Sequence, residues 1–464
     1  MNKKLALIIA LVMVVSVCAV LFVACDETYD LTYVSWNLGT EAGNNTERKM
    51  IKAFEEEYNV KVKIMEAGAG NNYDPALDAY AARNNMPDVF MTSNIDYVLR
   101  NNFAADITEF VNGDASGDWD KIPSAIEQST HYKSGIYAVP FSMHMMGYFV
   151  NVDLLEELNL SNELNALVEN FTFEGFKNLV SAVKGQNNGS GAKCIGLSAE
   201  DTIIEWYPAA LNENYGWFTW DGEQYHLDGS EFATAMQEAA SLRLNKLTYD
   251  SLNDEDRADD FEGVDGAVQL WDQGRLAIRW GSTYEAPNML TMNPQMNLMF
   301  LGVPGGRTPI VPDYLAISSS CKNKQLAYDF AKWMSFSPKG IMKRIELDNT
   351  RMPNTLPLIT DDSVIEAYFD KYTSVSGILE KYDSLDKGIV QSVKVVPGYR
   401  LARWDYKTGI QITKDGETIE NCNIGQLLDA CRTGEATLAD YANQINAFAN
   451  QQYAAAVAKY KNYN

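Results

Sequence analysis

Aromatic side chains stand in places where they could bind a ligand instead of filling a core. The chain has 9 tryptophans, 25 tyrosines and 18 phenylalanines, and several lie at the ends of predicted strands or in polar loops. A flat aromatic face beside carboxylates and amides suits a sugar, whose C–H faces stack on rings while its hydroxyls pair with donors and acceptors. Ordinary packing explains any single one of these residues equally well, but their grouping at strand–loop junctions favours a ligand role. The residues concerned are Trp36, Trp206, Trp217, Trp220, Trp280, Tyr284, Tyr399 and Trp404.

Motifs for catalysis are missing from the sequence. Its 3 histidines, His131, His144 and His226, stand at no metal-binding spacing such as HExxH. No GxSxG turn is present to carry a nucleophilic serine. Residues 185–193 lack the spacing of a phosphate-binding loop, and residues 68–70 lack the third glycine of a dinucleotide fingerprint. We therefore expect no enzyme activity, no catalytic residue and no cofactor.

Two acidic stretches could be mistaken for metal sites. Residues 112–120 carry oxygen-bearing side chains alternating around Gly117, as a calcium loop does. Pro123 stands where the closing glutamate belongs, so we expect an acidic turn without calcium. The acids of residues 253–262 are expected to form a solvated loop.

These side chains must be positioned by alternating strands and helices. Leu31–Trp36 is rich in residues that favour strands, and Val60–Ile64 alternates apolar with charged positions. Between them, apolar residues recur at helical spacing from Met50 to Tyr58. Strand, helix and strand in this order imply parallel strands joined by a right-handed crossover. A second helix, Tyr73–Arg83, and a third strand, Pro87–Met91, continue the pattern.

The rest of the chain repeats this rhythm, which predicts an α/β protein of two lobes, with open sheets flanked by helices. Residues 140–144 separate two short predicted strands. Apolar residues at helical spacing behind Thr172 predict a helix, and the tail from Ile424 predicts two more. Other predicted elements are the strands Ile136–Val139, Met145–Val150, Cys194–Ser198, Leu276–Trp280, Leu298–Val303 and Tyr314–Ser318, and the helices Gln325–Met334 and Pro338–Leu347.

The composition describes an acidic globular protein. Of 464 residues, 62 are acidic and 38 basic, which gives a net charge of −24. A field of that sign repels phosphate backbones and anionic lipid headgroups, so it argues against a nucleic-acid partner. Hydrophobic residues at 46% and charged residues at 22% are ordinary for a folded chain.

The N-terminus has the features of an export signal. Lys3 and Lys4 precede the uncharged run Leu5–Ala24, which ends at Cys25. An uncleaved membrane helix is the alternative. Val23-Ala24-Cys25 resembles the lipobox of bacterial lipoproteins, with Phe22 where leucine is usual. We expect residues 1–24 to be removed as a signal peptide and Cys25 to carry acyl chains, palmitate among them, that anchor the protein to the cell membrane.

Four further cysteines remain after the proposed lipid site. Cys194, Cys321, Cys422 and Cys431 form no CxxC pair and no zinc spacing. We expect buried free thiols. A disulfide between Cys422 and Cys431, which are close in sequence, is the alternative.

Short motifs along the whole mature chain resemble one family. Each is loose, but their order and spacing together are similar to the extracellular solute-binding proteins of carbohydrate ABC importers, the family that includes maltose-binding protein. The motifs are Trp36-Asn37-Leu38-Gly39-Thr40-Glu41, Phe54–Val62, Pro87-Asp88-Val89, Ile136–Pro140, Tyr148–Leu155, Gly274–Ile278 and Gln325–Phe330.

The resemblance implies a two-lobed periplasmic-binding-protein fold of type II, with a hinge and a ligand enclosed between the lobes. The chain would cross between lobes near Pro140–Ser142, near Tyr284 and near Leu347–Arg351. The N-lobe would then hold residues 26–140 and 285–346, and the C-lobe residues 141–284 and 347–464.

The resemblance also implies a ligand site and partners. The protein would be a monomer on the extracytoplasmic face of the cell membrane. It would capture a sugar or oligosaccharide and pass it to an ABC permease driven by a separate ATPase. By motif position, the ligand-binding residues would be Glu41, Ser93, Asn94, His144, Glu200, Trp206, Trp280, Tyr284, Arg351 and Trp404.

Three other interpretations stay open from the sequence. The ligand could be a phosphodiester, a polyamine or a peptide, because local residues set the field in a pocket. The protein could be a surface lipoprotein that binds glycans and serves no transporter. A glycosidase would also need aromatic residues near a pair of carboxylates.

Overall fold

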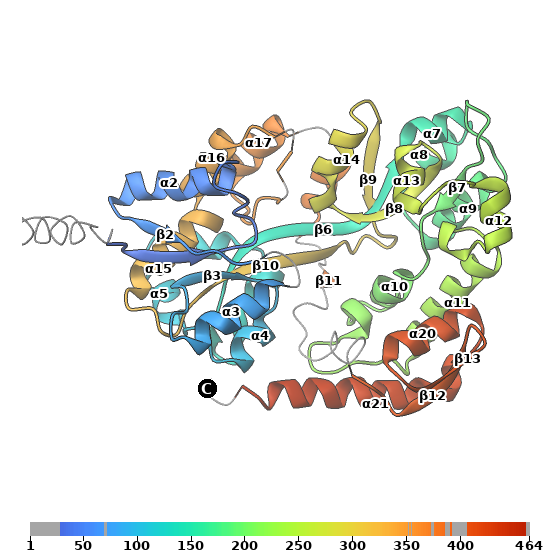
Figure 1. Cartoon of the computed structure of the whole chain (residues 1–464). Helices are drawn as coiled ribbons and strands as arrows, with labels where there is room; N and C mark the ends of the chain where they lie inside the picture. Colours follow the sequence, from blue (N-terminus) through green and yellow to red (C-terminus); the bar gives the residue numbers. More distant parts are fainter. Residues whose placement is uncertain are drawn as a thin grey trace, which may run out of the picture.

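A computed structural model gives the fold of residues 28–68, 72–350, 352–353, 355–372, 375–385, 390–391 and 406–460. These residues form two lobes that lie side by side and are joined by long strands (Figure 1). The predicted signal peptide and Cys25 lie outside the described residues. Among those described, no helix is both long enough and apolar enough to cross a membrane.

The first lobe begins as the sequence predicts. Its opening elements are β1 (Leu31–Val34), α2 (Thr46–Tyr58), β2 (Val62–Ile64), α3 (Tyr73–Ala82) and β3 (Val89–Thr92). Strand β1 pairs in parallel with both β2 and β3, which confirms the strand–helix–strand unit. Asn45 caps α2 by accepting a hydrogen bond from the Arg48 backbone, and Met50, Ile51 and Phe54 are its buried apolar face.

A single long strand, β6 (Val139–Asn151), links the lobes, where the sequence predicted two short strands. Pro140 caused the error, because proline normally interrupts a sheet. Pro140 is accommodated opposite Tyr314 beside a register shift, so that the pairing skips Phe141 and resumes at Ser142. Such a bulge lets a strand continue past an awkward residue.

The sheet passes from one lobe to the other through β6 (Figure 1). Its first half pairs with β10 (Pro309–Ile317), and its second half pairs with β8 (Leu276–Ser282) and β9 (Leu298–Gly302). Strand β7 (Ile195–Leu197) adds in parallel to β8. Among the described residues the order is β2-β1-β3-β10-β6-β8-β7, with β9 beside β6 and β11 (Val390–Gln391) beside β10.

The pairing of the strands bears on two of the expected crossings between lobes, which stay predictions. Strand β9 pairs with one half of β6 and β10 with the other, so the pairing changes halves at residues 303–308 and not near Tyr284. Helix α17 (Asp362–Lys371) still packs on α16 (Pro338–Leu347). The Phe300 amide of β9 donates to the Ser376 carbonyl. The chain after Tyr372 contacts both lobes, because the Tyr382 hydroxyl also donates to the carbonyls of Pro357 and Ile359.

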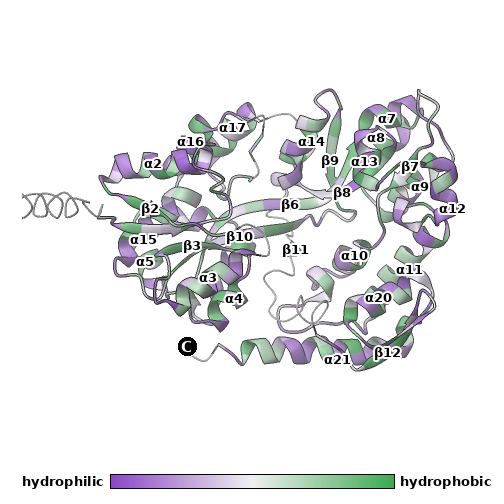
Figure 2. Ribbon diagram, in the orientation of Figure 1, coloured by the Kyte–Doolittle hydropathy of each residue, from purple (hydrophilic) through white to green (hydrophobic). Residues whose placement is uncertain are grey.

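Helices cover both lobes, and Figure 2 shows the strands β3, β9 and β10 as largely hydrophobic while the helices alternate hydrophobic and hydrophilic surface. Thr172 caps α9 as predicted. The remaining helices are α4 (Ile95–Arg100), α5 (Thr108–Gly113), α6 (Ser124–Gln128), α7 (Val152–Glu157), α8 (Ser161–Glu169), α9 (Phe173–Val183), α10 (Ile203–Leu211), α11 (Ser230–Leu244), α12 (Asp254–Asp260), α13 (Ala267–Asp272), α14 (Ala286–Met292), α15 (Lys324–Ser335), α18 (Ile378–Tyr382), α20 (Ile424–Thr433) and α21 (Leu438–Val457). Two hairpins complete the fold: β4 (His131–Tyr132) with β5 (Gly135–Ile136), and β12 (Ile410–Lys414) with β13 (Glu417–Cys422).

The acidic stretches and the cysteines differ partly from expectation. The predicted loop at residues 253–262 contains α12, which Asn253 caps and whose first-turn acids suit a helix N-terminus. Asp114 and Asp118 of the calcium-like loop both bind Lys332, at 2.7 and 3.0 Å.

Cys422 and Cys431 are free, so the alternative of a disulfide is wrong. Burial raises the pKa of the Cys431 thiol to about 12.

Candidate ligand-binding site

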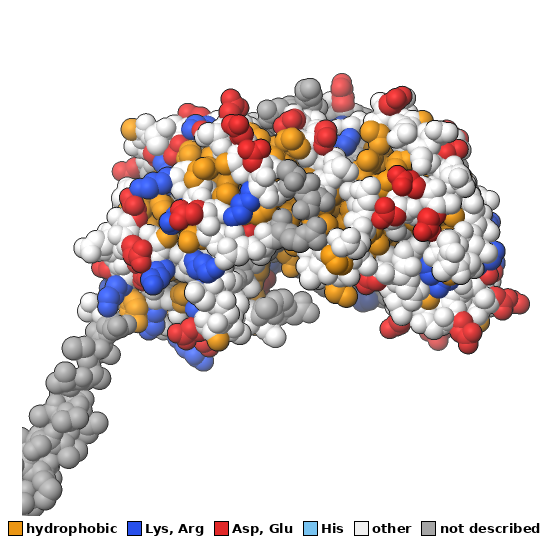
Figure 3. Space-filling model, turned by 90° about the horizontal axis from the view of Figure 1, so that it is seen from above, with side chains coloured by type: hydrophobic (Ala, Val, Ile, Leu, Met, Phe, Trp, Pro, Cys, Tyr) orange, Lys and Arg blue, Asp and Glu red, His pale blue; other side chains and the backbone are white. Residues whose placement is uncertain are grey.

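A cavity of about 910 Å³ lies where the two lobes meet. Seen from above, hydrophobic side chains gather in the middle of the molecule, between the lobes (Figure 3). The cavity takes its lining from both lobes and from the strands that join them. The lining residues are Trp36, Asn37, Asn45, Thr46, Glu47, Phe141, Ser142, His144, Met146, Glu205, Trp217, Ser282, Tyr284, Pro287, Val311, Asp313, Arg344, Asp348, Thr350, Met352, Pro353 and Thr355.

Two neighbouring strands form one side of the cavity. Ser142, His144 and Met146 alternate along β6, and side chains two residues apart in a strand point to the same face. On β10, Val311 is paired with His144 and Asp313 with Ser142. The strand register therefore sets these side chains beside one another, at the place where β6 passes between lobes.

Polar atoms on these strands are poised to bind a ligand. The Ser142 hydroxyl donates to Asp313 Oδ2 over 3.2 Å, and His144 Nε2 lies 3.4 Å from the same hydroxyl and 3.8 Å from Asp313 Oδ2. The other ring nitrogen, His144 Nδ1, is buried and has no hydrogen-bond partner in the described structure. A buried polar atom normally has a partner, so this nitrogen is available to a ligand as a donor or an acceptor, according to its tautomer.

The N-lobe wall is built from the loop after β1 and the start of α2. The Asn45 side chain donates to the Asn37 carbonyl over 2.6 Å, which ties the two segments together. Glu47 is buried and accepts a hydrogen bond from the Tyr33 hydroxyl at 2.6 Å. Burial raises the pKa of the Glu47 carboxyl, although Arg344 and the Tyr33 hydrogen bond oppose the rise.

Asp348 fixes a second part of this wall. Its carboxylate accepts hydrogen bonds from the hydroxyls of Thr46, Thr350 and Tyr372, at 2.8, 2.6 and 2.8 Å. Burial alone would raise the pKa of Asp348, but these hydrogen bonds outweigh it and bring the pKa below its usual range. The ionised carboxylate thereby joins α2 to the loop after α16, which lines the cavity.

The C-lobe wall brings aromatic rings to the cavity. Tyr284 is 55% exposed, and its ring meets His144 edge to face at 5.5 Å between centroids. Ser282 accepts a hydrogen bond from the Tyr284 backbone and so fixes the turn that presents this ring. Trp217 is buried apart from its edge on the cavity, and it packs against Trp280 at 6.3 Å.

Two of the predicted ligand residues, His144 and Tyr284, line the cavity. Trp280 does not line it, but contacts Trp217, which does. Arg351 and Trp404 lie outside the described residues. The neighbours of Arg351, Thr350 and Met352, are lining residues.

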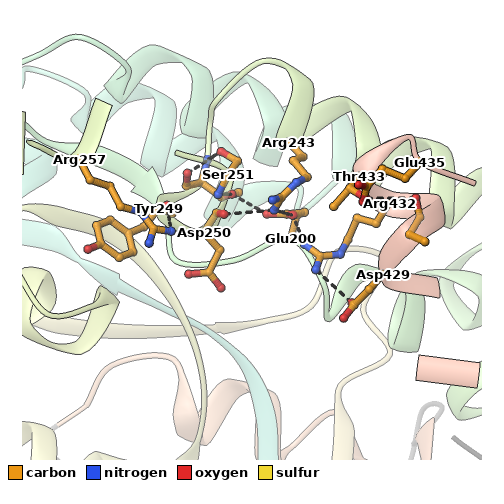
Figure 4. A network of polar contacts seen from close by, with 12 residues as sticks. Glu200, Arg243, Tyr249, Asp250, Ser251, Arg257, Asp429, Arg432, Thr433 and Glu435 are labelled. Atoms are coloured by element: carbon orange, nitrogen blue, oxygen red, sulfur yellow. Dashed lines mark hydrogen bonds and ion pairs between the residues drawn. The ribbon is translucent and has the colours of Figure 1, made fainter. Parts of the chain in front are cut away.

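Two other predicted ligand residues are instead enclosed within the C-lobe. Glu200 is fully buried and binds Arg243, Arg432 and Thr248, as Figure 4 shows for the two arginines. Trp206 is 1% exposed and packs against Tyr148 in the core. Neither side chain lines the cavity, and the phase of α10 turns Trp206 into the core while Glu205 faces the cavity.

The three remaining predicted residues also lie away from the cavity. Glu41 is exposed in a turn after β1. Asn94 caps α4 by accepting a hydrogen bond from the Asp96 backbone at 2.8 Å, and Ser93 beside it is half-buried. These side chains do follow the predicted strands, but none of the three is among the lining residues of the cavity.

Sequence reasoning missed several lining residues. Ser142 and Asp313 carried a usable signal, because each is a polar residue within an otherwise apolar strand and such a residue needs a partner. Glu47, Arg344 and Asp348 lie on or just after amphipathic helices and look like ordinary surface positions in the sequence.

Comparisons with known proteins find a matching family model and solved structures of similar fold. The sequence model for the family described as bacterial extracellular solute-binding protein matches residues 39–339. Among curated proteins, no match is found.

Solved structures share the fold at low sequence identity. An ABC substrate-binding protein from Listeria monocytogenes in complex with cycloalternan is 16% identical with a TM-score of 0.65, over 91% of this chain and 98% of that one. A cyclic alpha-maltosyl-1,6-maltose binding protein from Arthrobacter globiformis is 15% identical, with a TM-score of 0.62 over 91% and 98% of the two chains. A sugar transporter from Rhizobium etli in an open conformation is 15% identical, with a TM-score of 0.62 over 90% and 98%. These likenesses show the two-lobed fold.

Proposed function

The chain belongs to the family of bacterial extracellular solute-binding proteins, and from that premise we propose that it captures a sugar or oligosaccharide between its lobes for an ABC importer. The observation that carries the proposal is the cavity at the lobe junction, which combines aromatic rings with hydrogen-bonding side chains. Rings stack on the C–H faces of a sugar, and polar groups pair with its hydroxyls. Structures of similar fold named for cycloalternan and for cyclic maltosyl-maltose support this ligand class.

The proposed mechanism is capture without chemistry. A ligand that contacts both walls binds the closed arrangement of the lobes better than the open one, and this difference in affinity drives closure. Hinge closure of this kind is usual for periplasmic binding proteins. The closed protein would then dock on a membrane permease, which receives the ligand unaltered.

Strand pairing supports a division of the described residues between the lobes of the proposed hinge. We assign those within 28–145 and 309–372 to the N-lobe, and those within 146–302 and 406–450 to the C-lobe. Strand β6 and residues 303–308 would then flex as the lobes close.

The N-terminal sequence supports attachment to the outer face of the cell membrane through Cys25. Two acyl chains hold a protein firmly on a bilayer, whereas one does not. Replacing Cys25 with serine should move the protein from the membrane fraction to the soluble fraction. Retention of the variant in the membrane would instead support an uncleaved helix.

A second candidate ligand is a cationic solute such as a polyamine. Four carboxylates line the cavity, those of Glu47, Glu205, Asp313 and Asp348, against one arginine, Arg344, among the described lining residues. A basic solute would gain from this imbalance.

A thermal-shift screen tests the proposal and separates the two ligand classes. The mature protein is heated with mono- and oligosaccharides, and in parallel with putrescine and spermidine. A ligand present at 100 times its Kd should stabilise the fold by about 2.7 kcal/mol. A shift with a saccharide supports the main proposal, a shift with polyamines alone would favour the second candidate, and no shift with either would contradict both.

A further inference from the structure

The C-terminal helix α21 spans the space between the lobes at a place apart from the hinge strands. It begins at Leu438 in the C-lobe and ends at Val457, a length of about 30 Å at 1.5 Å per residue. In Figure 1 it runs beneath β6 and β10, from the C-lobe toward α4 of the N-lobe. Contacts of α21 with α11 and α20 on one side, and with α4 on the other, agree with this view.

The C-lobe half of α21 is firmly attached. Ile445 and Ala449 are buried in the C-lobe core. The Asn450 side chain accepts from the Tyr225 backbone N–H at 2.8 Å and donates to its carbonyl at 3.0 Å. Asn446 accepts from the Leu227 backbone at 2.9 Å. This half of the helix therefore moves with the C-lobe.

A buried polar network fixes the base of α21 through its neighbour α20. Figure 4 shows Arg243 of α11 and Arg432 of α20 both directed at Glu200. Arg243 lies 3.1 Å from Glu200, Arg432 binds the same carboxylate oxygen, and the Thr248 hydroxyl donates to the other oxygen at 2.5 Å. Arg432 is also held by Asp429 at 3.1 Å. Since α20 packs on both α11 and α21, the base of α21 is held in place.

The far end of α21 is attached to the other lobe. The Tyr460 hydroxyl donates to Asp96 Oδ1 at 2.5 Å, and Arg100 binds Asp96 Oδ2 at 2.7 Å. The Tyr460 ring meets Tyr132 edge to face at 4.9 Å. Tyr460 and Asp96 are only 5% and 2% exposed. Burial and the Asp96 charge raise the pKa of Tyr460, so its hydroxyl stays a donor.

We propose that α21 together with Tyr460 is a strap that ties the lobes together and restrains the hinge. The strap is anchored in the C-lobe, and its C-terminal end is held at the N-lobe by the buried hydrogen bond between Tyr460 and Asp96, which we call the latch. Any motion that separates the lobes at this place must first break that contact. The latch thereby sets how far the protein opens when no ligand is bound.

The test measures the distance between the lobes without any ligand, so its outcome does not depend on the proposed sugar. Nitroxide labels are placed at Ser134 and Glu223, exposed positions on the N-lobe hairpin and on the C-lobe loop that leads into Tyr225. The background is Cys25→Ser, and the four described native cysteines are buried. Double electron–electron resonance then gives the distance distribution between the labels.

We expect Tyr460→Phe and Asp96→Asn each to shift this distribution to longer distances, and the double variant to shift it no further than the larger single effect. Tyr441→Phe is the matched control, because Tyr441 lies on the same helix against the C-lobe core, and it should leave the distribution unchanged. A chain ending at Ala458, which lacks the latch altogether, should open most. Unchanged distributions in Tyr460→Phe and in the shortened chain, with circular dichroism showing both folded, would overturn the proposal.

Discussion

At the scale of single residues, His144 combines the features expected of a ligand contact. It is 7% exposed and faces the cavity from β6. One ring nitrogen lies beside Asp313, and the other has no hydrogen-bond partner among the residues that the structure describes. Tyr284 covers its edge. A ligand hydroxyl that bonds Nδ1 would supply the missing partner, and this is the contact that should matter most for affinity.

Replacing His144 with alanine should weaken ligand binding at least about tenfold, because a lost hydrogen bond to a buried polar group costs on the order of 1.4 kcal/mol or more. Isothermal titration calorimetry with the ligand found in the thermal-shift screen measures this. His226→Ala serves as the control, since His226 pairs with Asp221 away from the cavity. Equal affinity of the two variants would remove His144 from the site.

Single residues also show which parts of the cavity lining could be predicted from the sequence and which could not. His144 and Tyr284 do lie at the cavity, because their segments follow motifs whose place in the fold is fixed by strands. Trp206 lies in the core and not at the cavity for a local reason. It neighbours Glu205 on α10, and adjacent helical positions point about 100° apart, so a rotation by one residue decides between core and cavity. Only the packing of α10 against the C-lobe core sets that rotation.

At the scale of elements, α17 is tied to the rest of the N-lobe by the residue that caps it. Asp361 caps this helix and pairs with Lys121 at 2.9 Å. The Ser363 hydroxyl, and then Lys121, lower the pKa of Asp361 to about 2. Because the folded pKa is depressed, the charge contributes stability above its ordinary value of 3.8, and that contribution is lost as the pH falls toward 2.

Asp361→Asn should therefore lower the free energy of unfolding at pH 7 by less than about 1 kcal/mol, since asparagine keeps the cap and the lost ion pair is partly exposed. Urea unfolding at several pH values checks this. The difference from wild type should shrink as the pH drops from about 4 to about 2. If the difference in free energy of unfolding between the variant and wild type stayed constant with pH, the Asp361 charge would not be its cause.

Glu200 joins α10, α11 and α20, and removing its charge leaves two arginines without their shared partner. We expect Glu200→Gln to reduce the free energy of unfolding by about 3 kcal/mol, the range for breaking a buried ion pair. Ligand affinity of the folded variant should not change, because Glu200 lies outside the cavity. Urea unfolding and calorimetry measure the two quantities.

Glu174→Gln is the control for this prediction, because Glu174 makes an exposed pair with Lys177 and should cost little. A large loss of affinity in Glu200→Gln would restore the residue to the ligand site.

Elements with strong local signals were predictable, and those set by long-range pairing were not. Helices with a cap and an apolar stripe, such as α9, were placed correctly. Strand β6 was divided in two because its one proline, Pro140, breaks the local pattern. Its continuity comes from β10, which lies far away in the sequence and tolerates Pro140 through a bulge.

At the scale of the whole molecule, the strands of the proposed hinge join the two lobes, and the cavity lies between these lobes. The α/β class and the two-lobed fold followed from the sequence, because alternating strands and helices allow few arrangements. The change of pairing at residues 303–308 did not, since it depends on which half of β6 each later strand joins. The proposed strap adds a link between the lobes that no local sequence pattern predicts.

The most direct test of the account is calorimetric titration of the mature protein with saccharides, alongside Tyr284→Ala. We predict that one saccharide binds with a single site per chain and that Tyr284→Ala weakens its binding severalfold, because this exposed ring lies at the cavity wall and would lose its stacking contact. Binding of no saccharide, or binding that Tyr284→Ala and His144→Ala both leave unchanged, would contradict capture of a sugar between the lobes.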